Sequence, residues 1–228
     1  MFRSLPLWGG RERLLVFSPL QHITTYSIIS GNIASKDGAV LFAELSLSPQ
    51  DFFLALYKHL QTDYPKFYKM DNLCKLGFLA TEILLHGKNI NEAYEKTKTG
   101  IVLSNANASL DADIAYFESV KNIPSPAQFV YTLPNIVIGE ISIRHGFKGE
   151  NAFFVAEEFD AALPEFYVSD LFKRKSIDCC IAGWVDFLGQ SYKAVLYLVE
   201  NHSTERSLPW KTEHINKIYE LANGKING

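Results

Sequence analysis

Apolar residues recur along the chain at two different spacings, and each spacing predicts one type of element. Ser48 and Pro49 open the first helix, because serine caps helices and proline fits the first turn. The apolar residues that follow share one face of this helix: Phe52, Phe53, Leu56, Tyr57 and Leu60. The segment 69–86 is apolar around most of its circumference and ends before Gly87, so it predicts a helix buried between two layers.

Helices and strands alternate along the rest of the sequence. Further helices are predicted over residues 109–121, 135–145 and 160–173, with a brief helical turn after Ser125-Pro126 and a weak amphipathic helix after Ser207. Strands are predicted over residues 23–30, 101–104, 152–156, 177–183 and 194–200. Apolar strands that alternate with helices indicate a layered α/β fold with a mixed, largely buried sheet.

Composition narrows the class of protein. A chain of 228 residues with 47% hydrophobic content has ample core, and we expect a single domain over residues 1–228. The formal net charge of −3 predicts no nucleic-acid partner. No apolar run approaches the roughly 20 residues of a membrane span, and the N-terminus lacks the apolar core of a signal peptide. We therefore expect a cytoplasmic protein.

Cysteine and histidine usage predicts neither a disulfide framework nor a metal or cofactor site. The cysteines Cys74, Cys179 and Cys180 are odd in number, and two are adjacent, which favours packing within a strand. The histidines are dispersed, with no pair at metal-ligand spacing. The loop 104–107 has no glycine to cradle a phosphate, so no nucleotide site is predicted.

Several motifs occur in an order that resembles a known family. KMDNLCKLGFLATEILLHG at 69–87 is similar to a helix of the type R-M-D-x-x-x-R-L-A-x-x-A, and the segment 100–120 is similar to a strand and loop G-V-V-x-G-T-x-x-G-S. SPAQFVYTLPN at 125–135 has the spacing S-P-x-x-F-x-x-S-x-x-N. GFKGEN at 146–151 is similar to a loop G-x-x-G-P-x that precedes an active-site strand.

Two further segments complete the resemblance. SIDCCIAGWVDF at 176–187 is similar to a strand ending in A-G-G-x-E, and YKAVLYLVE at 192–200 is similar to an edge strand G-A-A-x-x-V-L-E. Over roughly residues 69–200 the chain thus resembles the N-terminal half of the β-ketoacyl synthases, condensing enzymes of thiolase-like fold. The resemblance implies one half of the duplicated thiolase-like unit, with a mixed sheet and helices on its faces.

The chain departs from this family where the chemistry takes place. The family's catalytic cysteine lies nine residues after the glycine that Gly149 matches, and the count ends on Glu158, next to Glu157. A carboxylate cannot replace a thiolate in acyl transfer without forming a labile anhydride. The family's active-site histidines and lysine belong to a C-terminal half, and this sequence ends before it. We therefore expect no catalytic residue and no independent condensing activity.

Glu158 is open to two interpretations. A helix N-terminus favours a carboxylate, so Glu158 is expected either to cap the helix or to contact a partner group. Alternatively it imitates the glutamine of chain length factors and of decarboxylating loading ketosynthases. Resemblance to chain length factors implies an active ketosynthase as partner, or a second copy of this chain, with acyl carrier protein engaged indirectly. The pathway implied is fatty acid or polyketide synthesis of the aryl polyene or flexirubin type.

Other functions stay open from the sequence: a decarboxylase or thioesterase acting on acyl carrier protein substrates through Glu158, or a scaffold protein without an acyl pocket. By the same resemblance, the segment around Asn135 lies at the dimer interface. Phe129, Tyr131 and Leu133 are then candidate tunnel or interface residues, with ordinary core packing as the alternative. A half-fold would also expose apolar helix faces unless the terminal segments 1–20 and 201–228 cover them, so association is expected.

Overall fold

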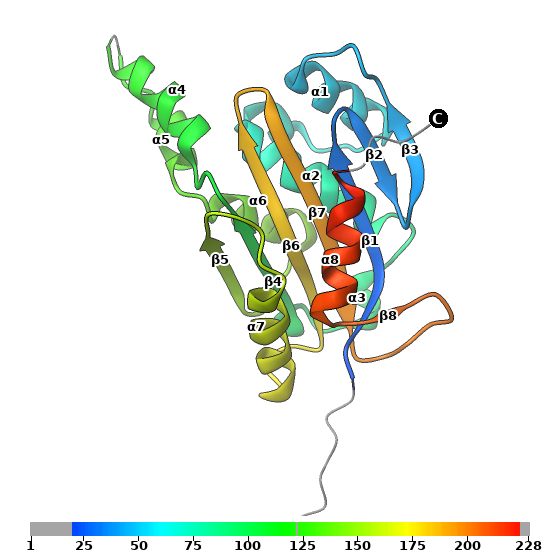
Figure 1. Cartoon of the computed structure of the whole chain (residues 1–228). Coiled ribbons are helices and arrows are strands. Elements are labelled where there is room, and N and C mark those ends of the chain that lie inside the picture. The colour runs from blue at the N-terminus through cyan, green and yellow to red at the C-terminus, as the bar shows by residue number, and fades with distance from the viewer. Residues whose placement is uncertain (1–19, 122, 224–228) are drawn as a thin grey trace, which may run out of the picture.

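The computed structural model describes residues 20–121 and 123–223, and its strands form one mixed sheet (Figure 1). The strands are β1 (His22–Ser30), β2 (Ile33–Lys36), β3 (Ala39–Ala43), β4 (Thr99–Asn105), β5 (Asn151–Val155), β6 (Cys179–Leu188), β7 (Ser191–Glu200) and β8 (Leu208–Pro209). Their order is β3-β2-β1-β7-β6-β4-β5, with β8 beside β1. β4 runs parallel to β5 and β6, and the remaining pairs are antiparallel.

Helices cover both faces of this sheet. They are α1 (Pro49–His59), α2 (Asn72–Leu85), α3 (Ile90–Ala93), α4 (Leu110–Val120), α5 (Pro126–Phe129), α6 (Ile136–His145), α7 (Ala162–Lys173) and α8 (Thr212–Leu221). Short 3₁₀ turns lie at η1 (Pro65–Lys69), η2 (Lys96–Lys98) and η3 (Val130–Thr132). α1, α2 and α6 pack on one face, and α7 and α8 pack on the other (Figure 1). The predicted layered α/β architecture is confirmed.

The buried helix α2 lies at the centre of the first layer. It begins later than predicted because the Asp71 side chain accepts a hydrogen bond from the Cys74 amide, 2.9 Å away, and so caps the helix. Phe78 and Leu79 on this helix are fully buried. Gly77 allows α6 to approach closely, since a Cβ at that position would lie 2.3 Å from Val137 Cγ2. The prediction of a helix buried between layers is confirmed.

The second layer is completed by the C-terminal segment. Trp210 is buried against Tyr197, whose hydroxyl donates to the Ile215 carbonyl at 2.9 Å on α8. Ile215 and Ile218 face the sheet with α7 beside them. The C-terminal segment thus covers this face of the sheet as far as residue 223, which is one of the two outcomes left open for residues 201–228; residues 1–19 lie outside the described part of the chain.

The structure corrects one strand prediction and adds a strand that was not predicted. The segment YKAVLYLVE, likened to an edge strand, forms β7 in the interior of the sheet, because β1 pairs along it from His22 opposite Glu200 to Ser30 opposite Lys193. Burial on both sides explains its nearly continuous apolar sequence. The edges are instead β3, which was not predicted, and β5.

Within the described ranges, no helix has the length and apolar character needed to cross a membrane.

Candidate functional site

The corner between β5 and α7 lies where the carboxyl ends of parallel strands meet (Figure 1). The Ala156 amide donates to the Asn105 carbonyl at 2.9 Å, which joins the end of β5 to the end of β4. Open α/β sheets place their ligands at such ends. The corner, residues 156–161, therefore lies where this class of fold places ligand-binding and catalytic residues.

Glu157 and Glu158 are both exposed at this corner. α7 begins at Ala162, whose amide donates to Asp160 Oδ1 at 2.8 Å. The N-cap of α7 is Ala161, which makes no side-chain cap hydrogen bond, so the helix-capping role considered for Glu158 is not filled by Glu158. Within residues 20–121 and 123–223, no hydrogen bond or ion pair joins Glu158 to another group. From the described part of the chain, Glu158 therefore receives no contact that would orient it as an acid or base.

The inner side of the corner is filled by aromatic rings. Phe159 stacks on Tyr219 of α8, with ring centroids 3.9 Å apart and planes 13° apart. Trp184 of β6 meets both rings edge-on, at 5.8 Å and 6.3 Å. The Lys193 ammonium lies 4.8 Å from the Tyr219 ring centroid. The helix α8 therefore packs against the corner and holds the residue after Glu158 inward.

The three cysteines are buried away from this corner. Cys74 lies in α2, and Cys179 and Cys180 lie at the start of β6. Burial raises the pKa of each thiol, so the thiolate needed for acyl transfer is disfavoured. Across the described residues, no group of three or more histidine, cysteine or acidic side chains is arranged to hold a metal ion.

The loop after β4 donates its hydrogen bonds to the carboxylate of Asp186, on β6. Asp186 Oδ1 accepts from the amides of Ala106 and Asn107 at 3.1 Å and 3.0 Å, and Asp186 Oδ2 accepts from the Asn107 side chain at 2.7 Å. Amides that could hold an anionic ligand are thus already satisfied. The loop acts as the rigid base from which α4 leaves the sheet.

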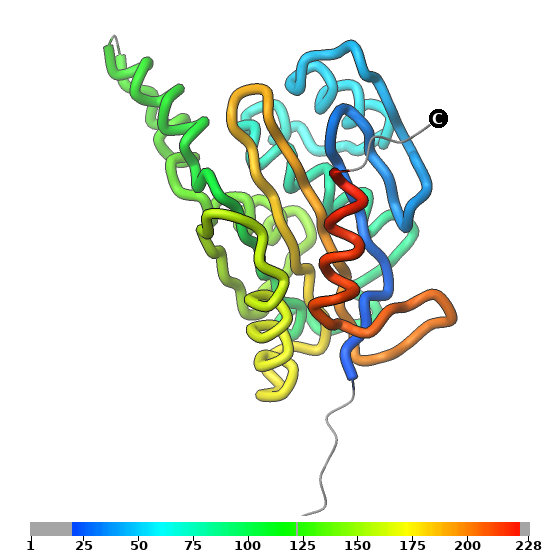
Figure 2. Tube along the Cα trace, viewed as in Figure 1, coloured from blue at the N-terminus to red at the C-terminus, as the bar shows by residue number. Residues whose placement is uncertain are grey.

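An arm leaves the body of the protein after this loop (Figure 2). The arm comprises α4, α5, η3 and Leu133, residues 110–121 and 123–133 of the described chain. Its large apolar side chains are 43–85% exposed: Leu110, Ile114, Phe117, Val120, Ile123, Phe129, Val130 and Leu133. Contiguous apolar surface of this kind usually marks an interface.

The arm carries three of the four predicted interface or tunnel residues. Phe129 and Leu133 are 59% and 58% exposed, so the core-packing alternative does not describe them. Asn135, just beyond the arm, is also exposed. Tyr131 turns the other way, and its hydroxyl donates to Glu140 Oε1 on α6 at 3.2 Å. Burial and the nearby Glu140 carboxylate raise the pKa of Tyr131, so the phenol stays protonated as the donor.

A cavity of about 220 Å³ separates the arm from the N-terminus of α2. Tyr131, Ala112 and Ala115 line it on the arm side, and Met70 and Asp71 line it on the body side. Burial raises the pKa of Asp71 despite its hydrogen bond from the Cys74 amide. Sequence reasoning missed this cavity, because segments far apart in the chain form its two walls.

The two edges of the sheet differ in how they are protected. β5, on the same side as the arm (Figure 1), has the sequence NAFFV without charge or proline, and Val155 is 55% exposed. β3 (AVLFA) also lacks charge and proline, but it is interrupted by a register shift against β2 between Ala34 and Ser35. Bulges and charges are the usual means by which an edge strand avoids pairing. β5 has neither, so it is the edge available to another chain.

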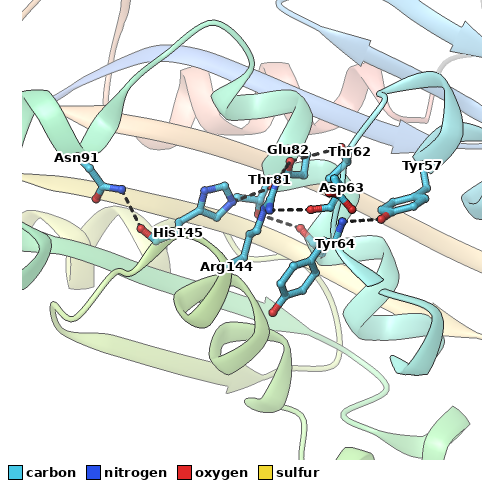
Figure 3. A network of polar contacts seen from close by, with 10 residues as sticks. Tyr57, Thr62, Asp63, Tyr64, Thr81, Glu82, Asn91, Arg144 and His145 are labelled. Atoms are coloured by element: carbon cyan, nitrogen blue, oxygen red, sulfur yellow. Dashed lines mark hydrogen bonds and ion pairs between the residues drawn. The ribbon is translucent and has the colours of Figure 1, made fainter. Parts of the chain in front are cut away.

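An ionic network joins the C-terminal ends of α2 and α6 (Figure 3). Glu82 Oε1 lies 3.2 Å from Arg144 Nε and 3.1 Å from His145 Nε2. Arg144 also donates to the Asp63 carbonyl at 3.2 Å, and its guanidinium carbon lies 5.2 Å from the Tyr64 ring centroid. Burial acts to raise the pKa of Glu82, but the hydrogen bonds from His145 and Arg144 hold that pKa below its usual range. The network fixes α6, from which Glu140 projects.

Together these features define the thiolase-like fold of the ketosynthase and chain length factor proteins, with a length that corresponds to one half of the duplicated unit. No family model matches the sequence, and no curated protein matches it. The solved structure of the ishigamide ketosynthase/chain length factor matches with a TM-score of 0.57 and 18% identity, over 79% of this chain and 62% of that chain.

Two further structures match in the same way. The structure of the ketosynthase ApeO in complex with its chain length factor ApeC, from Xenorhabdus doucetiae, gives a TM-score of 0.56 at 12% identity, over 90% of this chain and 92% of that chain. The AntDE:AntF complex of a type II polyketide ketosynthase with its acyl carrier protein gives 0.55 at 14% identity, over 80% and 63%. The chain spans less than two thirds of the first and third matches. At these identities the likeness shows the fold.

Proposed function

We propose that this chain is a non-catalytic, ketosynthase-like subunit of the chain length factor type. Residues 1–228 form one ketosynthase N-terminal-like domain that pairs with an active β-ketoacyl-ACP synthase. The pathway proposed is fatty acid or polyketide synthesis of the aryl polyene or flexirubin type. The observation that carries the proposal is the uncharged edge of β5 beside the exposed apolar arm.

The β5 edge and the arm together support a partner of the same architecture. An open strand with free backbone groups can add a strand from another chain. The arm supplies an apolar surface beside it, including Phe117 and Phe129. The arm leaves the body on the same side as β5 (Figures 1 and 2), so a subunit paired on β5 would also contact the arm.

The chemistry of the corner supports a role without catalysis. Condensation requires a thiolate to carry the acyl chain. Glu158 occupies the nucleophile position by the resemblance, yet it is exposed, and the three thiols are buried with raised pKa values. In the proposed complex the ketosynthase provides the nucleophile and engages the acyl carrier protein, which this chain meets only indirectly.

The arm is also the proposed place of chain-length control. Phe129, Leu133 and Asn135 are exposed, and in the proposed complex they would line the far end of the partner's acyl tunnel or the interface around it. Tyr131 lies behind them, against the body. Larger side chains at Phe129 or Leu133 are expected to shorten the product, and smaller ones to lengthen it.

The test is co-purification with the ketosynthase encoded in the same gene neighbourhood, using two matched valine variants. Val155→Lys places a charge on the β5 edge, and Val40→Lys places one on the β3 edge, where the valine is 50% exposed compared with 55% for Val155. We expect a stable heterodimer that Val155→Lys disrupts and Val40→Lys leaves intact. A wild-type chain that forms no heterodimer, or two variants with equal effects, would contradict the proposal.

The same preparations separate the alternatives. Malonyl turnover by the chain alone, abolished by Glu158→Ala, would identify a decarboxylase, and hydrolysis of acyl carrier protein thioesters would identify a thioesterase. If the heterodimer forms but its product has the same chain length after substitutions at Phe129 and Leu133, the chain is a scaffold without an acyl pocket.

A further inference from the structure

The arm is joined to the body with little apolar packing. Within the described residues, Ala112 is the one buried residue of α4, and α5 and η3 contribute none. The cavity of about 220 Å³ lies where side chains would otherwise pack between arm and body. Apolar contacts in proteins set a position only where atoms fill the space between two elements. Tyr131 is the arm side chain that packs against the main core, so the angle of the arm depends on this residue and on the polar contacts of the arm.

One polar contact lies where the arm returns to the body. Glu140 on α6 is 4% exposed, and its carboxylate joins two other elements. Tyr131 of η3 donates to Oε1 at 3.2 Å, and Lys66 of η1 lies 2.8 Å from Oε2. A buried carboxylate is costly unless such partners satisfy it, so the three groups hold one another in place.

A second polar contact lies where the arm leaves the body. Asp111, in the first turn of α4, accepts from the Asn72 side chain at 2.9 Å and from the Gly189 amide at 3.1 Å. The buried hydroxyl of Ser109, the residue just before the arm, donates to the Thr132 carbonyl near the other end of the arm at 2.9 Å. The arm is thus one unit attached near its two ends, and among these contacts the carboxylate of Glu140 is buried, whereas that of Asp111 is partly exposed.

We propose that Glu140 is a positioning residue that, through Tyr131 and Lys66, sets the angle at which the arm presents its apolar surface to the partner subunit. This inference rests on the proposed function, because it concerns the same interface. It adds a residue that touches no substrate and lies outside the contact surface. The partner then binds an arm that is already oriented, and little ordering is needed on association.

The test compares two tyrosine variants that remove the same type of hydrogen bond. Tyr131→Phe removes the contact with Glu140. Tyr94→Phe removes the matched contact with Glu200, a carboxylate that is 3% exposed and 2.7 Å from the Tyr94 hydroxyl, at a position remote from the arm. Affinity for the ketosynthase is measured by calorimetry, thermal stability by scanning fluorimetry, and order in the arm by hydrogen exchange of residues 110–133.

We expect similar falls in melting temperature for the two variants but different effects on binding. Tyr131→Phe should weaken ketosynthase affinity by about tenfold, as for a lost hydrogen bond to a charged group, and should speed exchange in the arm. Tyr94→Phe should leave both unchanged. Glu140→Gln, which keeps an acceptor for Tyr131, should retain more affinity than Glu140→Leu.

The outcomes distinguish this inference from the function on which it rests. If the wild-type chain binds the ketosynthase and Tyr131→Phe loses no more affinity than Tyr94→Phe, the positioning role of Glu140 is overturned and the proposed function stands. If the wild-type chain does not bind, both are overturned.

Discussion

Substituting Gly77 by alanine tests whether the close approach of α2 and α6 determines the packing beneath the arm. The added Cβ would lie 2.3 Å from Val137 Cγ2, whereas nonbonded carbon atoms prefer about 3.5–4.0 Å, so a shift of at least about 1 Å is required. Overpacking of a core costs about 1–3 kcal/mol, and a contact as short as 2.3 Å belongs to the upper half of that range, about 2–3 kcal/mol, whereas alanine recovers about 0.8–1.0 kcal/mol over glycine within a helix. We expect a net loss of about 1–2 kcal/mol in the free energy of unfolding.

The assay is urea unfolding with a double-mutant cycle. Val137→Ala alone should destabilise the protein by removing buried methyl groups, but Gly77→Ala combined with Val137→Ala should lose less than the two single changes together. A destabilisation of this size should lower the melting temperature by about 2–4 °C per kcal/mol for a chain of this length. If Gly77→Ala is as stable as the wild type, or if the two changes are additive, the close helix contact does not limit the packing.

Three further outcomes follow from the structure. Tyr219→Ala removes the stack on Phe159, so it should cost about 1–2 kcal/mol and speed hydrogen exchange over residues 156–161; unchanged exchange there would contradict the role of α8 in holding the corner. The lowered pKa of Glu82 means that its stabilisation is fully present above the unfolded-state pKa of about 4.3 and is lost as pH falls through the lower folded-state value. Glu82→Gln should therefore have a lower melting temperature than the wild type at pH 7. Between pH 5 and pH 3 the melting temperature of the variant should fall less than that of the wild type; an equal fall in both proteins would refute this. The three buried cysteines should react with a thiol reagent only at the rate of unfolding, and fast labelling of the native protein would show that a thiolate is accessible.

The strongest sequence patterns predicted the elements that form the core. The helix around residues 69–86 was recognisable because apolar residues surround it, and the structure buries Phe78 and Leu79 on it. β2 and β3 escaped prediction because they are short. The sequence of β2 (IASK) is only partly apolar, and β3 (AVLFA) is apolar although it is mostly exposed, so neither shows the alternation that marks one buried face. The place of β7 in the sheet depends on its pairing with β1, from which a long stretch of chain separates it, and a single segment carries no information on such pairing.

The candidate site divides in the same way. The resemblance to the β-ketoacyl synthases implied the position of Glu158 at the corner after β5, but its exposure depends on where α7 begins and on how Asp160 holds the Ala162 amide. The segment around Phe129 was recognised by its spacing, whereas the polar contact between Tyr131 and Glu140 could not be, because core and surface roles for Tyr131 fit the sequence equally well. Contacts between segments that are far apart in the sequence could therefore not be predicted and are visible only in the folded structure.

The most direct test of the central claim is hydrogen exchange of this chain with and without its ketosynthase partner. The β5 edge (residues 151–155) and the arm (residues 110–133) should gain protection in the complex, because their backbone and apolar surfaces become covered. β3, at the opposite edge of the sheet, should exchange at the same rate in both samples. Protection over β3 in place of β5, or no protection at either edge, would contradict pairing through the β5 edge and the arm.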